Sequence, residues 1–215
     1  MSLINYRITV ETPSGPEKLS GMAELSPGPL HVRCEVPEGL LRDVEADMRL
    51  EITEGDRIFV NGYQTWTYSP EFAPWDVQKV FGKKLPKKLT DKFFLERYGD
   101  LFFRKYPETP GVFSGFSYCY IRNGSDYRLF ASLDEEPGYT IFKVDASSDK
   151  LCIERDCRGM NCGGELKAFD LFYAEGGEDE VFDAWFDALG VKARTTDKLA
   201  GYTSWYNRYN KISES

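Results

Sequence analysis

Apolar and polar residues alternate along most of the chain. In residues 4–12 the apolar Tyr6, Ile8 and Val10 are separated by charged or hydroxyl side chains, and residues 44–52 repeat the pattern with one charged face. A period of two is typical of half-buried β-strands. Comparable apolar runs predict further strands over residues 30–36, 58–68, 113–122, 127–133, 140–144, 151–155, 166–174 and 199–207.

Turn-forming residues separate these runs. Asn123-Gly124-Ser125 and Ser147-Ser148-Asp149 each stand between two predicted strands, and such spacing predicts hairpins. The glycines of residues 159–164 lack the strand-to-helix context of a phosphate-binding loop, so they predict a turn or a bulge. The sequence therefore predicts a mainly β fold with antiparallel pairing.

Two segments change to the helical period. Apolar residues recur at helical spacing over residues 90–104, with Thr90 as an expected N-cap. The whole insertion between strands, residues 73–110, could be a lid, but an edge cover is the more common role of such a segment. The same spacing predicts an amphipathic helix that ends at Gly190. One or two short helices are thus expected beside the sheet.

Composition excludes several classes of function. The net charge is −8, which disfavours binding to a phosphate backbone, and no run of about 18 apolar residues predicts a membrane span. The N-terminus shows no basic patch followed by an apolar stretch, so no secretory signal is predicted. The odd number of cysteines, 5, favours reduced thiols and a cytoplasmic location.

No metal or other cofactor is expected. Cys152, Cys157 and Cys162 are evenly spaced, but a zinc site would need a fourth ligand and His31 is the only histidine. These cysteines are better interpreted as small apolar residues in or beside strands. His31 lies in a predicted strand without an evident serine partner, which argues against a serine hydrolase.

Two aromatic segments have specific patterns: Asn61-Gly62-Tyr63-Gln64-Thr65-Trp66 and Gly201-Tyr202-Thr203-Ser204-Trp205-Tyr206. Their order around an all-β stretch resembles the α-galactosidases of glycoside hydrolase family 36. In that family an Asn-Gly-x-Gln-Ser/Thr-Trp segment precedes the catalytic barrel, and a Gly-aromatic-x-Ser-Trp-Tyr segment forms the first barrel strand. The resemblance covers the chain in order, but only these two segments are specific.

The resemblance implies a fold and a domain organisation. Residues 1–190 are expected to form a large antiparallel, supersandwich-like β-sandwich. Residues 191–215 would be a linker and the first strand and helix start of a truncated (β/α)8 barrel. A complete barrel needs about 250 residues. Residues 199–215 are therefore expected to be poorly ordered or to pair with another chain.

The resemblance also implies an activity, the retaining hydrolysis of terminal α-galactosides. Such enzymes use two carboxylates about 5–5.5 Å apart. In this family both are aspartates of later barrel strands, so this chain alone is predicted to be inactive. Glu135-Glu136 and Glu178-Asp179-Glu180 are interpreted as structural, the second group because acidic residues suit a helix N-terminus.

The implied role of this chain is to bind substrate. By position Trp66 would reach the sugar pocket, and Trp205 and Tyr206 would lie near its floor; the alternatives are a buried sandwich tryptophan and packing inside a barrel layer. Trp75 and Trp185 are predicted to be packing residues. The expected partner is a galactose-containing oligosaccharide, and a homo-oligomer is possible.

Another class of function remains open. The chain could be a non-catalytic carbohydrate-binding or protein-interaction module, and within the family the substrate could instead be an N-acetylgalactosaminide. The coding sequence after Ser215 would separate enzyme from module.

Overall fold

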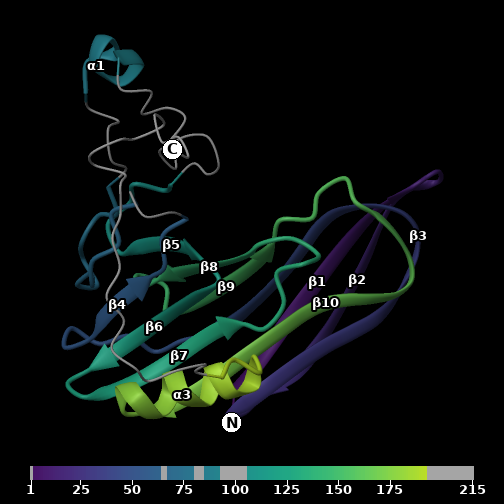
Figure 1. The fold of residues 1–215 in the computed structure, drawn as a ribbon. Helices are drawn as coiled ribbons and strands as arrows, with labels where there is room; N and C mark the ends of the chain where they lie inside the picture. Colours follow the sequence, from purple (N-terminus) through teal and green to yellow (C-terminus); the bar gives the residue numbers. More distant parts are fainter. Residues whose placement is uncertain (1, 64–66, 80–84, 93–105, 193–215) are drawn as a thin grey trace, which may run out of the picture.

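The computed structural model describes residues 2–63, 67–79, 85–92 and 106–192 (Figure 1). The predicted strand 199–207 lies outside the described residues. The same is true of nearly all of the segment 191–215.

The described residues confirm a mainly β fold with a large antiparallel sheet. Within the described residues two helices, α1 (Lys87–Lys92) and α3 (Glu178–Ala188), accompany the sheet. The strands are β1 (Ser2–Thr12), β2 (Gly15–Leu25), β3 (Gly28–Arg49), β4 (Arg57–Val60), β5 (Val112–Phe116), β6 (Tyr118–Asn123), β7 (Asp126–Ser132), β8 (Thr140–Asp145), β9 (Lys150–Arg155) and β10 (Asn161–Gly176). No helix among the described residues is long and apolar enough to cross a membrane.

The ten strands form one sheet, in which eight follow the order β4-β6-β7-β10-β3-β9-β8-β5. β1 pairs with β3 outside this order, and β2 pairs with β1 (Figure 1). The two ends of the order meet, because Asn61 follows β4 and forms hydrogen bonds with Phe116 of β5. The sheet therefore curves around its own core.

Large aromatic and branched side chains fill the interior. Phe113, Phe142 and Phe169 have no exposed surface. A second, smaller cluster lies under α3, where Val181 and Trp185 pack on residues of β7 and β10. The two faces of the curved sheet thus have separate apolar cores, and α3 covers one of them.

Two predicted strands, 30–36 and 44–52, proved to be parts of a single strand, the 22-residue β3. Pro37 directly follows the first of these predicted strands, yet it lies within β3. There Gly39 pairs with Cys162 and Val36 with Gly164, so two residues of β3 face Gly163 alone. A bulge of this kind accommodates proline, which has no N–H to donate to the ladder. The predicted turn or bulge in residues 159–164 is therefore confirmed.

The predicted strand 113–122 is wrong as a continuous element. Ser117 adopts a φ of 65° and divides it into β5 and β6. The Ser117 N–H donates to the carbonyl of Thr140, and the Ser117 carbonyl accepts from the N–H of Ser132. These bonds hold the break in place. β5 lies at one end of the strand order, and β6 lies next to β4 at the other end.

Three other predictions need correction. The strand expected over 58–68 ends at Val60, because Asn61 turns to β5 and β6. The helix expected over 90–104 begins at Lys87, and the Thr90 hydroxyl donates to the Lys87 carbonyl instead of capping the helix. Residues 93–104 lie outside the described residues. β2 was missed, because its exposed edge position leaves little apolar alternation.

Other predictions are confirmed. The predicted hairpins 123–125 and 147–149 join β6 to β7 and β8 to β9. Helix α3 ends as expected before Gly190, which has a φ of 69°. The acidic residues of 178–180 form its first turn.

Candidate functional site

Residues 61–69, called here the aromatic loop, begin where β4 ends. The Asn61 N–H donates to the Tyr118 carbonyl (3.1 Å), and its own carbonyl accepts from the N–H of Phe116 (2.8 Å). The Asn61 side chain donates from Nδ2 to the Phe116 carbonyl (3.1 Å). Three hydrogen bonds therefore fix the first residue of the loop on β5 and β6.

Two glycines allow the close approaches that this geometry needs. A Cβ atom on Gly115 would lie within 3.0 Å of the Asn61 backbone. A Cβ atom on Gly62 would lie equally close to the side chains of Thr67 and Ser69. The described ends of the aromatic loop thus lie side by side.

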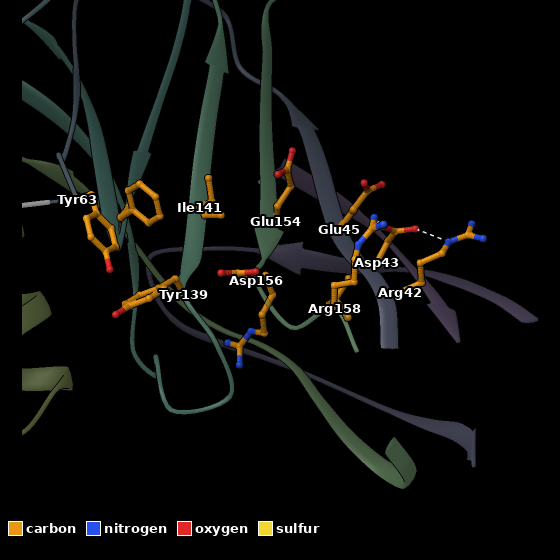
Figure 2. Close-up of a pocket in the computed structure, with 12 residues that line it drawn as sticks. Arg42, Asp43, Glu45, Tyr63, Tyr139, Ile141, Glu154, Asp156 and Arg158 are labelled. Atoms are coloured by element: carbon orange, nitrogen blue, oxygen red, sulfur yellow. Dashed lines mark hydrogen bonds and ion pairs between the residues drawn. The ribbon is translucent and has the colours of Figure 1, made fainter. Parts of the chain in front are cut away.

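Tyr63 of this loop forms an aromatic trio with Phe116 and Tyr139. Figure 2 shows Tyr63 and Tyr139 near each other. The ring of Tyr63 meets Phe116 edge-on at a centroid distance of 5.1 Å and Tyr139 at 5.7 Å. The third pair, Phe116 with Tyr139, is also edge-on, at 6.1 Å. Phe116 is buried, whereas Tyr139 is 46% exposed, so the trio joins the core to an accessible ring.

The turn between β7 and β8 holds Tyr139 in place. The Tyr139 carbonyl accepts a hydrogen bond from the Asp156 N–H (2.9 Å). Gly138 has a φ of 127° and lies so close to the Asp156 carbonyl that a Cβ atom on Gly138 would collide with it. A Glu135 carboxylate oxygen accepts from the Thr140 N–H (2.5 Å). Burial raises the pKa of Glu135. The structural interpretation of Glu135 is thus supported.

The trio forms one wall of a cavity of about 310 Å³. Ile141 of β8 and Glu154 of β9 lie in the middle of the cavity (Figure 2). On the side away from the trio, the cavity is lined by charged side chains of β3 and by Arg158, which follows β9. Glu154 stands directly opposite Glu45 of β3 in the sheet register. The cavity therefore has an aromatic end and a charged end.

Ion pairs order the charged end. Asp43 accepts from Arg42 Nε (2.8 Å) through one oxygen and from Arg158 (2.6 Å) through the other. Arg42 also donates to Glu11 (2.9 Å). The hydrogen bonds to Asp43 and Glu11 raise the pKa of Arg42. Carboxylates and guanidinium groups thus lie at one end of the same cavity, where they can accept hydrogen bonds from hydroxyl groups and donate to them.

Arg155 supports the cavity from the interior. The side chain is 6% exposed, and Nη2 donates to the Asp134 carbonyl (3.2 Å). Its guanidinium lies 5.9 Å from the ring centroid of Phe169. Burial lowers its pKa. Arg155 thereby ties the turn that bears Tyr139 to β9.

The three predicted binding residues, Trp66, Trp205 and Tyr206, lie outside the described residues. Their roles stay predictions. The sequence interpretation did not single out Tyr63, although it belongs to the same motif as Trp66, and it missed Phe116 and Tyr139. Pro137-Gly138 before Tyr139 was a turn signal that could have marked an exposed ring.

The two predicted packing tryptophans differ. Trp185 is buried, and its Nε1 donates to the Ser132 carbonyl (3.1 Å), so that prediction is confirmed. Trp75 is 60% exposed, so the prediction for it was wrong. It lies in a turn that Asp76 closes by accepting from the Ala73 N–H (2.8 Å), which leaves the Trp75 side chain outside the core.

The remaining candidate residues have structural contacts. His31 Nδ1 lies 2.5 Å from Asp170, which also accepts from Arg33. Cys157 donates to the Arg155 carbonyl and Cys162 to the Pro37 carbonyl. Among the residues that the structure describes, no group of three or more His, Cys, Asp or Glu side chains could hold a metal ion.

Comparison of the sequence with protein-family models and with curated proteins found no match.

Proposed function

We propose that this chain is the N-terminal β-sandwich domain of a retaining α-galactosidase-like glycoside hydrolase that acts on terminal α-galactosides. In this proposal the curved sheet is the sandwich, and residues 191–215 begin the catalytic barrel. The chain supplies aromatic contacts to the sugar, and the catalytic carboxylates come from the barrel.

The observation that supports this proposal best is the anchoring of the aromatic loop. Asn61 and Gly62, the first two residues of the family-like motif, fix the start of the loop that contains Trp66 in sequence. Tyr63, the next residue, packs into the aromatic trio at the cavity wall. Flat rings suit the C–H faces of a hexose, and the nearby carboxylates and arginines suit its hydroxyl groups.

Binding of melibiose and raffinose to the 215-residue chain tests the sugar-contact role. Isothermal titration calorimetry should detect binding that is weaker in Trp66→Ala and Tyr139→Ala. The loss of one stacked ring, worth about 1 kcal/mol, corresponds to a roughly five- to tenfold rise in Kd. Trp75→Ala is the matched control, because this exposed ring lies outside the aromatic loop and does not line the cavity. Equal effects of control and test variants would contradict the proposed contact.

A hydrolysis assay tests the proposal that the chain binds the sugar while the barrel supplies the catalytic carboxylates. The chain alone should release no nitrophenol from p-nitrophenyl α-galactoside, because the proposed carboxylate pair belongs to the barrel. Turnover by the purified chain would refute that division of roles. Glucosides and N-acetylgalactosaminides in the same titration would define the sugar that the cavity prefers.

The alternative is a non-catalytic carbohydrate-binding module. It is favoured by the fact that, among the described residues, aromatic rings and charged side chains line one cavity without any contribution from residues 191 and 192 at the start of the proposed barrel segment. A coding sequence that continues after Ser215 with aspartate-bearing barrel strands would favour the enzyme, and a stop there would favour the module.

A further inference from the structure

The β1/β2 hairpin has an exposed edge. β2 spans eleven residues and, within the described parts of the chain, has β1 as its only strand partner. Figure 1 shows the hairpin in purple as a long ribbon on the side of the sheet away from β4 and β5. A long edge strand offers a row of backbone donors and acceptors to another strand.

The hairpin geometry identifies those donors and acceptors. Thr12 pairs with Gly15 around the two-residue loop Pro13-Ser14. In such a hairpin the closing pair exchanges hydrogen bonds, and every second residue beyond it does the same. The odd-numbered residues of β2 therefore bond to β1. The even-numbered residues direct their backbone groups outward, and Pro16, which has no N–H, marks the end of this row.

We propose that β2 pairs antiparallel with β2 of a second copy of this chain, with the two-fold axis at Gly21. This register places Lys18 directly opposite Glu24 of the second copy, and it does so twice by symmetry. Opposite charges that face each other across two strands stabilise the pairing.

The same register also places compatible side chains of the two copies opposite each other on both faces of β2. On the inner face Leu19 and Ala23 are half-buried and pack against the main core. In the proposed pair each lies opposite the other, so the apolar face continues from one copy into the next. On the outer face Met22, which is 69% exposed, lies opposite Ser20 and diagonal to Met22 of the second copy.

Other registers of the two β2 strands do not place Lys18 opposite Glu24. Opposite residues must have the same parity, since inner and outer faces alternate along a strand. A shift of one step in one direction places Lys18 opposite Met22 and Glu24 opposite Pro16. A shift in the other direction places Lys18 opposite Ser26 and Glu24 opposite Ser20. Since Glu24 is the only acidic residue among the outer-face positions of β2, the Gly21-centred register alone pairs the charges.

Charge reversal tests the proposal in solution. Sedimentation of the 215-residue chain over a range of concentrations should show a reversible monomer–dimer equilibrium. Lys18→Glu or Glu24→Lys alone should each raise the dimer Kd about tenfold, because two attractive pairs become repulsive. The double variant K18E/E24K should restore the wild-type Kd. Both residues are exposed, and thermal unfolding would verify that each variant is folded.

Cysteine cross-linking tests the register itself. An equimolar mixture of Lys18→Cys and Glu24→Cys should form a disulfide-linked dimer above the background of the native thiols. Lys18→Cys alone should form no such dimer. In the proposed register, position 18 of one copy is six residues away along the strand from position 18 of the other copy, a distance of about 20 Å. The proposal is overturned if the protein stays monomeric, if charge reversal leaves the dimer unchanged, or if Lys18→Cys alone cross-links as well as the mixture. None of these outcomes depends on sugar binding.

Discussion

Asn61 directs the chain out of the sheet through its main chain and its side chain together. The three hydrogen bonds to Phe116 and Tyr118 need the Asn61 backbone to lie very close to Gly115. At this scale, the position of the aromatic loop depends on one small residue of the neighbouring strand.

Gly115→Ala tests this dependence. The added methyl group would meet the Asn61 backbone, which cannot rotate away, so we expect a loss of about 1–3 kcal/mol in the free energy of unfolding. Urea denaturation measures it. Gly55→Ala is the matched control, because a Cβ atom there meets only ordinary contacts. Equal stability of the two variants would contradict the close approach.

Glu71 is held by a two-pronged ion pair. Its carboxylate accepts from Arg122 Nε (2.7 Å) and Nη2 and from the Tyr120 hydroxyl (3.1 Å). The hydrogen bond from Arg122 lowers the pKa of Glu71 below its ordinary value of 4.5. The stability from this pair is therefore present above the unfolded-state pKa and is lost as the pH falls through the lower folded-state pKa.

Glu71→Gln should accordingly cost about 1–2 kcal/mol at neutral pH. The difference from wild type should shrink as the pH falls below 4.5, because the wild-type carboxylate then becomes protonated. Unfolding curves from pH 7 to pH 3 measure this. A difference that stays constant over the whole range would show that the charge of Glu71 contributes nothing.

At the scale of elements, two buried side chains, Val181 and Trp185, attach α3 to the sheet. Trp185 fills the space between the helix and the sheet, and its Nε1 satisfies the buried Ser132 carbonyl. Tyr118 of β6 contacts the same ring at a centroid distance of 5.2 Å. The helix is thereby attached to the strands next to the break at Ser117.

Substitutions at Trp185 separate packing from hydrogen bonding. Trp185→Phe should cost about 1–2 kcal/mol, because the Ser132 carbonyl loses its donor. Trp185→Ala should cost about 3–5 kcal/mol, because a cavity forms as well. Phe186→Ala, at a neighbouring ring that is 42% exposed, should cost less than about 1 kcal/mol. Chemical denaturation ranks the three, and a harmless Trp185→Phe would argue against the hydrogen bond.

At the scale of the whole molecule, the sheet supports two separate surfaces. The cavity takes its lining from β3, β5, β8 and β9 and from adjoining loops, and no residue of β2 contributes to it. The edge of β2 is separated from β5 and β8, which adjoin the aromatic end, by several strands in the pairing order, and from β3, which carries part of the charged end, by β1. Sugar binding and self-association should therefore be independent.

The two single variants Tyr139→Ala and Lys18→Glu measure this independence. Tyr139→Ala should weaken melibiose binding and leave the sedimentation behaviour unchanged, and Lys18→Glu should do the reverse. Each protein is studied in both assays at the same concentrations. Coupled losses in either variant would show that pairing through β2 reshapes the cavity.

The sequence by itself determined the class of fold and most local elements. Strand alternation, the turn at residues 123–125 and the end of α3 at Gly190 depend on neighbours a few residues away, so the local pattern predicts them. The acidic first turn of α3 was predictable for the same reason, because the helix dipole acts on its own first turn.

Only the tertiary structure decided how these elements meet. The continuity of β3 through Pro37 depends on the bulge opposite Gly163, and the break at Ser117 depends on bonds to Thr140 and Ser132. The aromatic trio unites Tyr63 with rings from two distant segments. A sequence pattern contains the period of each strand but not its partner across the sheet, and both the cavity and the free edge of β2 are consequences of that pairing.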